Sequence, residues 1–418
     1  MKLLTVLLSL LCSLGVVELH MSRRLPPADF TIAWPTRFHP HVGFMFEPLS
    51  EVRWTNGVDF AASGKTNSLG FLDREHDFSK PRDTFRILLL GDSMVAAAEV
   101  PLAQKLSTLL EKSLDERLPS RRFEVIAMGT YGAGTTDELT LYREFGRNFR
   151  PDLVVILFVN NDFANNSAIL EAVRNGWSPR HPPRSFFVKN DRSDSFVPID
   201  LDERWERFLL PVRSPGFSLQ RSSSFIPFLS WSATYRWATA VLDERLGISA
   251  RRRDEVLRER LAVLRKDPEI AAQLHGWEYP DDLDDDEMFF AESMPPVFES
   301  AVEVTDYVFS VLQDESARAP FHLLVVGSDG CSFPPVRVKG RRRLVDRGYF
   351  LRLKRLLDGR RIPLLDLYES FRWQGEPRLA HWEHDPHWNP LGHRWAAEAV
   401  SNYLVQHESE FLAPLHEE

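Results

Sequence analysis

The chain has 418 residues, a formal net charge of −9 and 27% charged residues, a length compatible with one α/β domain that carries insertions and buries a large core. The acidic balance disfavours a general nucleic-acid binder or a protein held to anionic membranes by charge alone. Two cysteines, Cys12 and Cys331, exclude a disulfide framework.

Residues 1–22 predict a signal peptide or a membrane anchor. One lysine precedes an uncharged apolar run from Leu3 to Val17, which is the pattern of a signal-peptide core. The run is short for a membrane span, and no small-residue cleavage site follows it, so a cleaved signal and an uncleaved anchor both stay open. A buried first helix of a cytosolic protein is the remaining alternative. We expect an exported, extracytoplasmic protein, in the periplasm or on the cell surface, with its N-terminus as a membrane tether.

Residues 23–80 are rich in proline and aromatic residues and predict short strands and turns that lead into a main domain at 81–418. In that domain, apolar runs closed by polar residues alternate with segments of helical spacing, which predicts a doubly wound parallel α/β sheet flanked by helices. The expected strands are Arg86–Asp92, Phe123–Gly129, Pro151–Asp162, Phe321–Gly330 and Ile362–Leu367, and the expected helices are Leu102–Leu118, Thr135–Phe149, Phe298–Glu315, Tyr349–Leu357 and Leu391–Gln406.

The alternation stops at about 164–296, which we interpret as a large central insertion. This stretch contains an Arg-rich helical segment at Arg251–Arg265 and an acidic run at Asp281–Glu287. The acidic run lacks the glycine and the distal glutamate of a calcium-binding EF-hand loop, so we expect a solvated loop.

Ser93 lies in a Gly-Asp-Ser sequence at the end of the first expected strand and the start of a helix. Ligands of open parallel sheets bind at the carboxyl ends of the strands. The N–H groups and the dipole of a helix N-terminus stabilise negative charge that develops there, which suits the nucleophile of an acyl transfer. Serine and aspartate also cap ordinary helices, so Ser93 and Asp92 by themselves leave both interpretations open.

Later segments supply the partners that a serine nucleophile needs. A glycine-rich turn after the second strand offers the N–H of Gly132, and the Asn160-Asn161 pair after the third offers a side-chain amide. A hydroxyl nucleophile also needs a neutral imidazole, which a carboxylate must hold in the correct tautomer. The stretch His-Trp-Glu-His-Asp-Pro-His near the C-terminus contains both kinds of group, at His381, Glu383, His384, Asp385 and His387.

The order of these motifs resembles the four sequence blocks of the SGNH (GDSL-like) hydrolases, over residues 84–162 and 321–407. The resemblance implies Ser93 as the nucleophile and His387 as the general base. It also implies an oxyanion hole made of the backbone N–H groups of Ser93 and Gly132 and the side chain of Asn161. The upstream sequence Asn-Ser-Leu-Gly-Phe at Asn67–Phe71 is similar to that of membrane-anchored bacterial members.

Two positions depart from the family pattern. Val159 stands where the third block usually has glycine, so the backbone there is expected to be less open. In the last block the acid is usually three residues before the histidine, but that position is His384. Asp385, two residues before His387, matches the Asp-x-His spacing of alginate-type polysaccharide O-acetyltransferases. This spacing favours Asp385 as the residue that orients the imidazole, with Glu383 as the alternative.

Other residues are assigned supporting roles. Asp92 is expected to support the nucleophile, and Asn389 is expected to brace the histidine loop through its backbone. His393 is interpreted as a packing or capping residue of the last helix. Trp382 and Trp388 flank the expected base and suit either stacking on a sugar or packing in the core.

Together these features predict an exported SGNH-type serine esterase that hydrolyses an oxygen ester, such as an acyl or acetyl group on a carbohydrate or small molecule, through an acyl-enzyme on Ser93. No metal or organic cofactor and no nucleic-acid partner are expected. The alternatives are an O-acetyltransferase acting on an envelope or secreted polysaccharide, and a non-catalytic glycan-binding or assembly protein. The patterns predict no oligomeric state.

Overall fold

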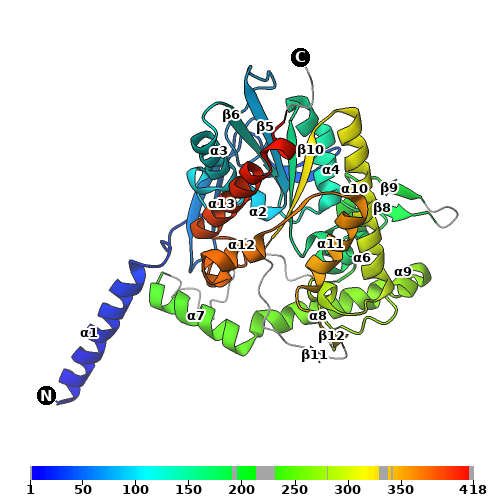
Figure 1. The fold of residues 1–418 in the computed structure, drawn as a ribbon. Coiled ribbons are helices and arrows are strands. Elements are labelled where there is room, and N and C mark those ends of the chain that lie inside the picture. Colours follow the sequence, from blue (N-terminus) through cyan, green and yellow to red (C-terminus); the bar gives the residue numbers. More distant parts are fainter. Residues whose placement is uncertain are drawn as a thin grey trace.

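A five-stranded parallel sheet lies at the centre of the computed structural model, which describes residues 2–190, 195–212, 231–279, 281–328, 338–339 and 342–413 (Figure 1). The strand order is β13-β10-β7-β5-β6, so the chain passes from β5 to one edge and then returns to build the other side. The doubly wound architecture is therefore confirmed. The strands are β5 (Thr84–Gly91), β6 (Arg122–Gly129), β7 (Leu153–Phe158), β10 (His322–Gly327) and β13 (Leu364–Asp366).

Both faces of the sheet are buried, which explains the continuous apolar runs in the sequence. Successive side chains of a strand point to opposite faces. In β5, Leu88 and Leu90 pack into the core on one face, whereas Ile87 and Leu89 pack into the core on the other. All four are at most 2% exposed.

Helices cover each face of the sheet. One face packs against α3 (Leu106–Arg117), α12 (Leu367–Gln374) and α13 (Pro390–Gln406). The other packs against α4 (Thr135–Glu144), α10 (Pro296–Arg318) and α11 (Gly348–Arg360). The expected helices are confirmed in position but differ at their ends, and α10 and α11 are each longer than expected. The helix expected from Leu102 begins as a separate turn at Leu102–Gln104, and the one expected to reach Phe149 ends at Glu144.

The N-terminal segment is a single helix, α1 (Lys2–Ser22), which extends away from the sheet in Figure 1. It lies beside α7 (Ala233–Leu246). The carboxylate of Glu18 accepts hydrogen bonds from the Ser232 hydroxyl at 2.7 Å and the Ala233 amide at 2.8 Å, at the start of α7. Among the described helices, none combines the length and the apolar character that crossing a membrane requires.

The lead-in contains short strands, as expected, in two antiparallel hairpins. β1 (Thr36–His39) pairs with β2 (Gly43–Phe46), and β3 (Glu51–Thr55) pairs with β4 (Ala61–Lys65). A small buried cluster joins these hairpins to the segment that follows Ser93. It consists of Phe46, Val52, Leu72 and Ala98.

The stretch interpreted as an insertion forms helices and a hairpin beside the sheet, and its residues 213–230 lie outside the described part of the chain, as does Cys331. The Arg-rich helix is confirmed as α8 (Ile248–Leu264). Other described elements of this stretch are α6 (Ala168–Asn175), β8 (Phe186–Lys189), β9 (Phe196–Ile199) and α9 (Pro268–Gln273).

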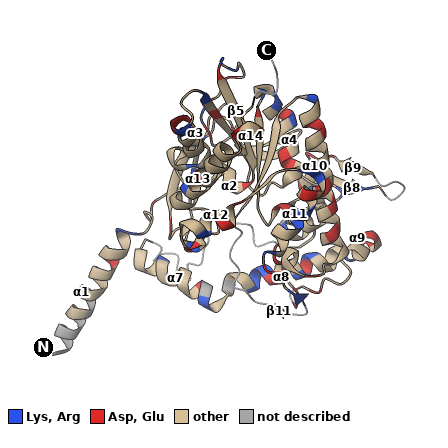
Figure 2. Cartoon of the chain, viewed as in Figure 1, with Lys and Arg blue, Asp and Glu red and all other residues tan. Residues whose placement is uncertain are grey.

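The acidic run is not a solvated loop, and that expectation is wrong. Asp285 is 1% exposed and accepts a hydrogen bond from the Arg174 guanidinium at 2.7 Å, and Arg253 of α8 lies 3.2 Å from its other oxygen. Asp282 pairs with Arg342 at 2.8 Å. Charges that are far apart in the sequence thus neutralise one another, as the adjoining red and blue segments around α8 in Figure 2 indicate.

Candidate active site

Ser93 lies at the carboxyl edge of the sheet, two residues after the end of β5, which pairs with β6 and β7. It begins α2 (Ser93–Ala96), a helix of four residues that ends where Ala97 adopts a left-handed conformation with φ +45°. Ser93 therefore begins a separate single turn that precedes the helix expected over Leu102–Leu118, and the dipole at its position is that of one turn. Gly129 at the end of β6 lets α2 approach closely, because a Cβ atom there would lie 2.3 Å from the Ala96 nitrogen.

His387 and Asp385 lie in the loop before α13 and meet Ser93 in space. The Ser93 hydroxyl oxygen is 2.8 Å from Nε2 of His387, and Nδ1 of the same ring is 2.6 Å from Oδ1 of Asp385. A neutral imidazole whose Nδ1–H donates to Asp385 presents Nε2 as an acceptor to the hydroxyl. The contacts among Ser93, His387 and Asp385 are those of a serine–histidine–aspartate triad.

Asp385, rather than Glu383, contacts the imidazole. Oδ1 of Asp385 also accepts a hydrogen bond from the backbone amide of His387 at 3.0 Å, so the two residues form a tight turn. Glu383 is exposed. The backbone amide of His384 donates to Asp59 at 2.9 Å, which ties the histidine loop to the lead-in.

Asp92 connects the nucleophile to Asn161. Its Oδ1 accepts the Met94 amide at 2.8 Å and thereby caps α2, whereas its Oδ2 accepts from Nδ2 of Asn161 at 3.1 Å. Burial raises the pKa of Asp92, although these hydrogen bonds act in the opposite direction. Asn161 thus lies beside Ser93, with its amide held in place by the residue that precedes the nucleophile.

Arg184 holds the turn that carries Gly132. Gly132 has φ +69°, a conformation that glycine adopts at little cost, and its carbonyl oxygen accepts a hydrogen bond from the Arg184 guanidinium. Arg184 also pairs with Asp137 at 3.0 Å.

Val159 fits the turn after β7 by placing its side chain in the core, while its amide donates to Asp162 at 2.7 Å.

The remaining predicted residues stabilise the loop or fill the core. Asn389 caps α13 by accepting the Leu391 amide at 2.8 Å, and its Nδ2 donates to the His381 carbonyl at 2.7 Å, so it braces the histidine loop. His393 is 2% exposed and accepts the Leu106 amide at 3.3 Å. Trp388 is fully buried and belongs to the core. The Trp382 ring lies 5.3 Å from that of Phe60 in the lead-in.

One residue of the site, Glu99, was missed in the sequence. Its Oε1 is 3.5 Å from Nδ1 of His387, and the Tyr131 hydroxyl donates to the same oxygen at 2.7 Å. Its side chain is 1% exposed. The available signal was a single acid in an otherwise apolar segment, six residues after Ser93. Such an isolated charge is costly to bury without a partner.

The charges around His387 control its protonation. Burial by itself would lower the pKa of this imidazole, but the negative charges of Glu99 and Asp385, and the hydrogen bond to Asp385, outweigh burial and raise the pKa to about 9. Burial raises the pKa of Glu99, and the charge of His387 acts against that rise. The surroundings of His387 therefore stabilise its protonated, imidazolium form.

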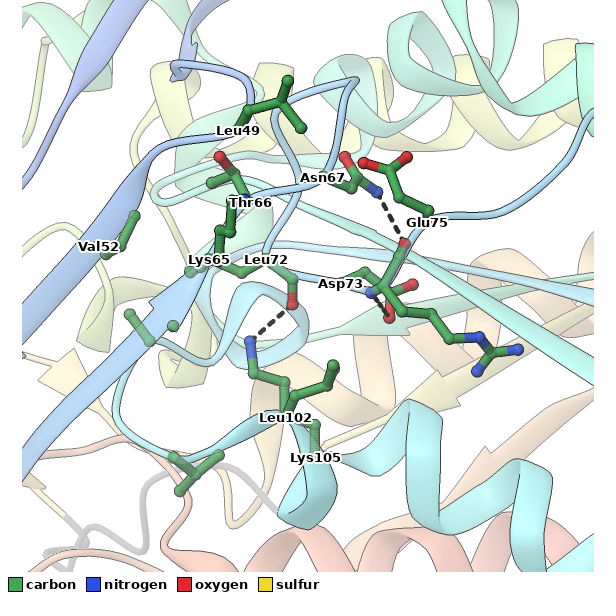
Figure 3. Close-up of a pocket in the computed structure, with 14 residues that line it drawn as sticks. Leu49, Val52, Lys65, Thr66, Asn67, Leu72, Asp73, Glu75, Leu102 and Lys105 are labelled. Carbon is green, nitrogen blue, oxygen red and sulfur yellow. Dashed lines mark hydrogen bonds between the residues drawn. The ribbon is translucent and has the colours of Figure 1, made fainter.

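A cavity of about 280 Å³ lies between the lead-in and the segment that follows α2 (Figure 3). Ala98 and Val100, the neighbours of Glu99, line it together with residues of the lead-in. Lys105 closes one side and donates from Nζ to the Leu72 carbonyl at 2.8 Å and to the Ala96 carbonyl at 2.6 Å. These bonds join the lead-in to the end of α2 and so help to fix the segment between Ser93 and Glu99.

The fold and the site thus define an α/β protein with an aligned serine, histidine and aspartate at the carboxyl edge of its sheet. No protein-family model and no curated protein matches the chain. Among solved structures, it is similar to a lipase/acylhydrolase from Enterococcus faecalis, with 12% identity over 77% of this chain and 96% of that one and a TM-score of 0.36. It is also similar to an acetyl xylan esterase, with 12% identity over 77% of this chain and 100% of that one and a TM-score of 0.35.

Proposed function

We propose that the chain is a serine esterase of the SGNH type that hydrolyses an oxygen ester through an acyl-enzyme on Ser93. The observation that carries the proposal is the 2.8 Å contact between the Ser93 hydroxyl and Nε2 of His387, with Asp385 on the other ring nitrogen. A serine that only capped a helix would need neither partner. The substrate class that we propose is an acyl or acetyl ester of a carbohydrate or small molecule.

In the proposed reaction, Oγ of Ser93 attacks the acyl carbon while its proton passes to Nε2 of His387. The negative charge moves to the former carbonyl oxygen, where the N–H groups of Ser93 and Gly132 and the amide of Asn161 are the proposed donors. The imidazolium then protonates the leaving alcohol oxygen, and the C–O bond breaks to give the acyl-enzyme. Water, deprotonated by His387, attacks the acyl carbon and releases the carboxylic acid and the free serine.

Covalent labelling by a fluorophosphonate tests this proposal directly, because the reagent phosphonylates an activated serine. We expect the wild-type protein to form a stable adduct and the Ser93→Ala variant to form none. Ser107→Ala is the matched control, because Ser107 is a buried serine on α3, away from the triad, and should leave labelling unchanged. If the wild-type protein forms no Ser93-dependent adduct between pH 6 and 10, the esterase proposal fails and a non-catalytic glycan-binding role takes its place.

A second candidate is transfer of the acyl group to a polysaccharide hydroxyl. The position of Asp385, two residues before His387, favours this candidate, since the same spacing occurs in alginate-type O-acetyltransferases. Both reactions use the same acyl-enzyme and differ only in the acceptor. Incubation of the protein with an isotope-labelled acetyl ester and a polysaccharide distinguishes the two reactions. Labelled acetate in solution indicates hydrolysis, and labelled acetyl groups on the polymer indicate transfer.

We also propose that residues 1–22 direct export and tether the protein to a membrane. The uncharged apolar run from Leu3 to Val17 supports this proposal. Fractionation of cells that express the full chain tests it, together with N-terminal sequencing of the recovered protein. Recovery in the membrane fraction with Met1 retained is expected for an anchor, and a shortened soluble protein outside the cytoplasm for a cleaved signal. Recovery in the cytoplasm contradicts both.

A further inference from the structure

Glu99 and Asp385 approach the same ring nitrogen of His387 from different parts of the chain. Asp385 accepts hydrogen bonds from both the backbone amide and the ring of His387, so both of its contacts lie within one loop. It can fix the tautomer and the rotation of the ring relative to that loop. It cannot by itself fix the distance between the loop and Ser93, because both partners of this contact move together with the loop.

Glu99 belongs to the nucleophile's side of the site. It follows Ser93 by six residues, and its carboxylate is held by the Tyr131 hydroxyl, which in turn accepts the Ala98 amide at 3.0 Å. Tyr131 lies in the same turn as Gly132, after β6. The 3.5 Å contact from Glu99 to His387 therefore connects the histidine loop to the segment that carries Ser93 and the turn that carries the Gly132 amide.

We propose that Glu99 is a positioning residue that stays ionised and, by its charge, holds the imidazole of His387 against Ser93 and stabilises the imidazolium formed during the reaction. This inference rests on the proposed esterase function. Asp385 fixes the tautomer, and Glu99 fixes the histidine loop relative to the nucleophile. A buried carboxylate this close to an imidazolium is weakly screened by water, so its charge acts strongly.

The charged and titratable groups that face the Glu99–His387 pair are few in the described part of the chain. Asp385 and Asp92 add negative charge near the imidazole, and the buried His393, whose pKa is lowered to about 3 by burial and by the charges of Lys105 and His387, stays neutral. The charges of Lys105 and Glu99 interact. The Tyr131 hydroxyl donates to Glu99, and the pKa of this phenol is raised well above its usual value by burial and by the Glu99 charge, so it stays protonated. The Tyr131 ring also lies 5.9 Å from the His387 ring, but among these groups only Glu99 brings a charge to Nδ1 from the segment that follows Ser93.

Removal of the Glu99 charge should change the pH dependence in a characteristic way. His387 must be neutral to accept the serine proton, so kcat/KM rises with pH as the imidazolium loses its proton. Without the Glu99 charge the imidazolium is less stable, and this rise should move to lower pH by about 1 to 3 units. The plateau at alkaline pH should fall, because the imidazolium that forms in the transition state also loses this stabilisation.

The test compares Glu99→Gln, which keeps the size of the side chain, with the wild-type protein. The second-order rate of fluorophosphonate labelling is measured from pH 5 to 10, and the His387 imidazole resonance is titrated by NMR, assigned with His387→Gln. We expect a shift of both profiles to lower pH and a lower alkaline plateau. An unshifted profile with a lower plateau would mean that Glu99 only supports the fold, and this result overturns the inference.

The NMR titration and a second variant keep the inference testable on its own. The NMR titration of His387 reports the Glu99 charge even if no labelling occurs, so loss of labelling in the wild-type protein counts against the esterase proposal alone. If Glu99→Gln fails to fold, Tyr131→Phe replaces it. Loss of the phenol hydroxyl destabilises the Glu99 carboxylate, so the same shift to lower pH is expected, and its absence contradicts the inference.

Discussion

Ser93 and His387 are 294 positions apart in the sequence, and the hydroxyl oxygen of one lies 2.8 Å from Nε2 of the other. The parallel sheet brings the two residues together, because Ser93 follows the carboxyl end of β5 and the loop before α13 lies at the same edge of the sheet. Asp385 completes the arrangement from within the histidine loop, and Glu99 from within the serine segment. The geometry leads to four predictions besides the labelling test.

The acid that orients His387 is predicted to be Asp385 rather than Glu383. Asp385→Asn should reduce kcat/KM for an activated acetyl ester by about 10² to 10⁴, because the amide can present its N–H to the ring and favour the wrong tautomer. Glu383→Gln, two residues earlier and exposed, is the matched control and should stay within a factor of about two of wild type. Equal losses in both variants would contradict the assignment.

Ester hydrolysis is predicted to be faster in alkaline solution. The carboxylates of Glu99 and Asp385 raise the pKa of His387 to about 9, so below this pH most of the free protein carries an imidazolium that cannot accept the serine proton. A plot of kcat/KM against pH should therefore rise up to about pH 9 and then level off. A plateau that is already reached at pH 6 would mean that the two carboxylates do not act together on the imidazole.

Asn161 is predicted to donate to the developing oxyanion. Asn161→Ala should lower kcat by about 10² to 10³ with little change in KM, since the lost hydrogen bond forms mainly in the transition state. Asn160→Ala removes the same side chain one position earlier and serves as the control. A change in KM with kcat unchanged would contradict the assignment of Asn161 as the donor. A larger fall in kcat for Asn160→Ala than for Asn161→Ala would contradict it as well.

Glu138 is predicted to destabilise the fold at neutral pH. It is fully buried, neither carboxyl oxygen has a hydrogen-bond partner among the described residues, and burial next to Asp92 and Asp137 raises its pKa well above the usual value. The folded state therefore holds a proton that the unfolded state releases above about pH 4.5. From that pH upward, this group costs up to about 1.4 kcal/mol of stability per pH unit, until the pKa of the folded state is reached.

Glu138→Gln should accordingly raise the free energy of unfolding at pH 8, and the gain should shrink as the pH approaches 4.5. Glu124→Gln is the control of opposite sign. Glu124 pairs with Arg86 at 2.6 Å and with His76 at 2.8 Å, contacts that lower its pKa against the effect of burial, so its charge stabilises the fold and its removal should destabilise it. Urea unfolding at both pH values measures the two effects, and stabilisation by both substitutions would refute this account of Glu138.

Local patterns in the sequence were sufficient to predict the sheet and the place of the site. The run before Gly91 is apolar at every position because β5 is covered on both faces, and the polar residues Ser93, Gly132 and Asn161 all follow strands that end at one edge. The resemblance of the Asp-x-His spacing to that of alginate-type O-acetyltransferases favoured Asp385 over Glu383, and Oδ1 of Asp385 lies 2.6 Å from the His387 ring.

Only the tertiary structure revealed the partners that come from distant segments. The contact of Glu99 with His387 depends on how α2 turns at Ala97, and the burial of Asp285 depends on Arg174 and Arg253. From the sequence alone a charged residue is expected to be solvated, because the opposite charge that would compensate for its desolvation cannot be identified along the chain. Periodicity and turn chemistry are local and can be read along the chain, whereas the pairing of buried charges is determined by packing between segments far apart in it.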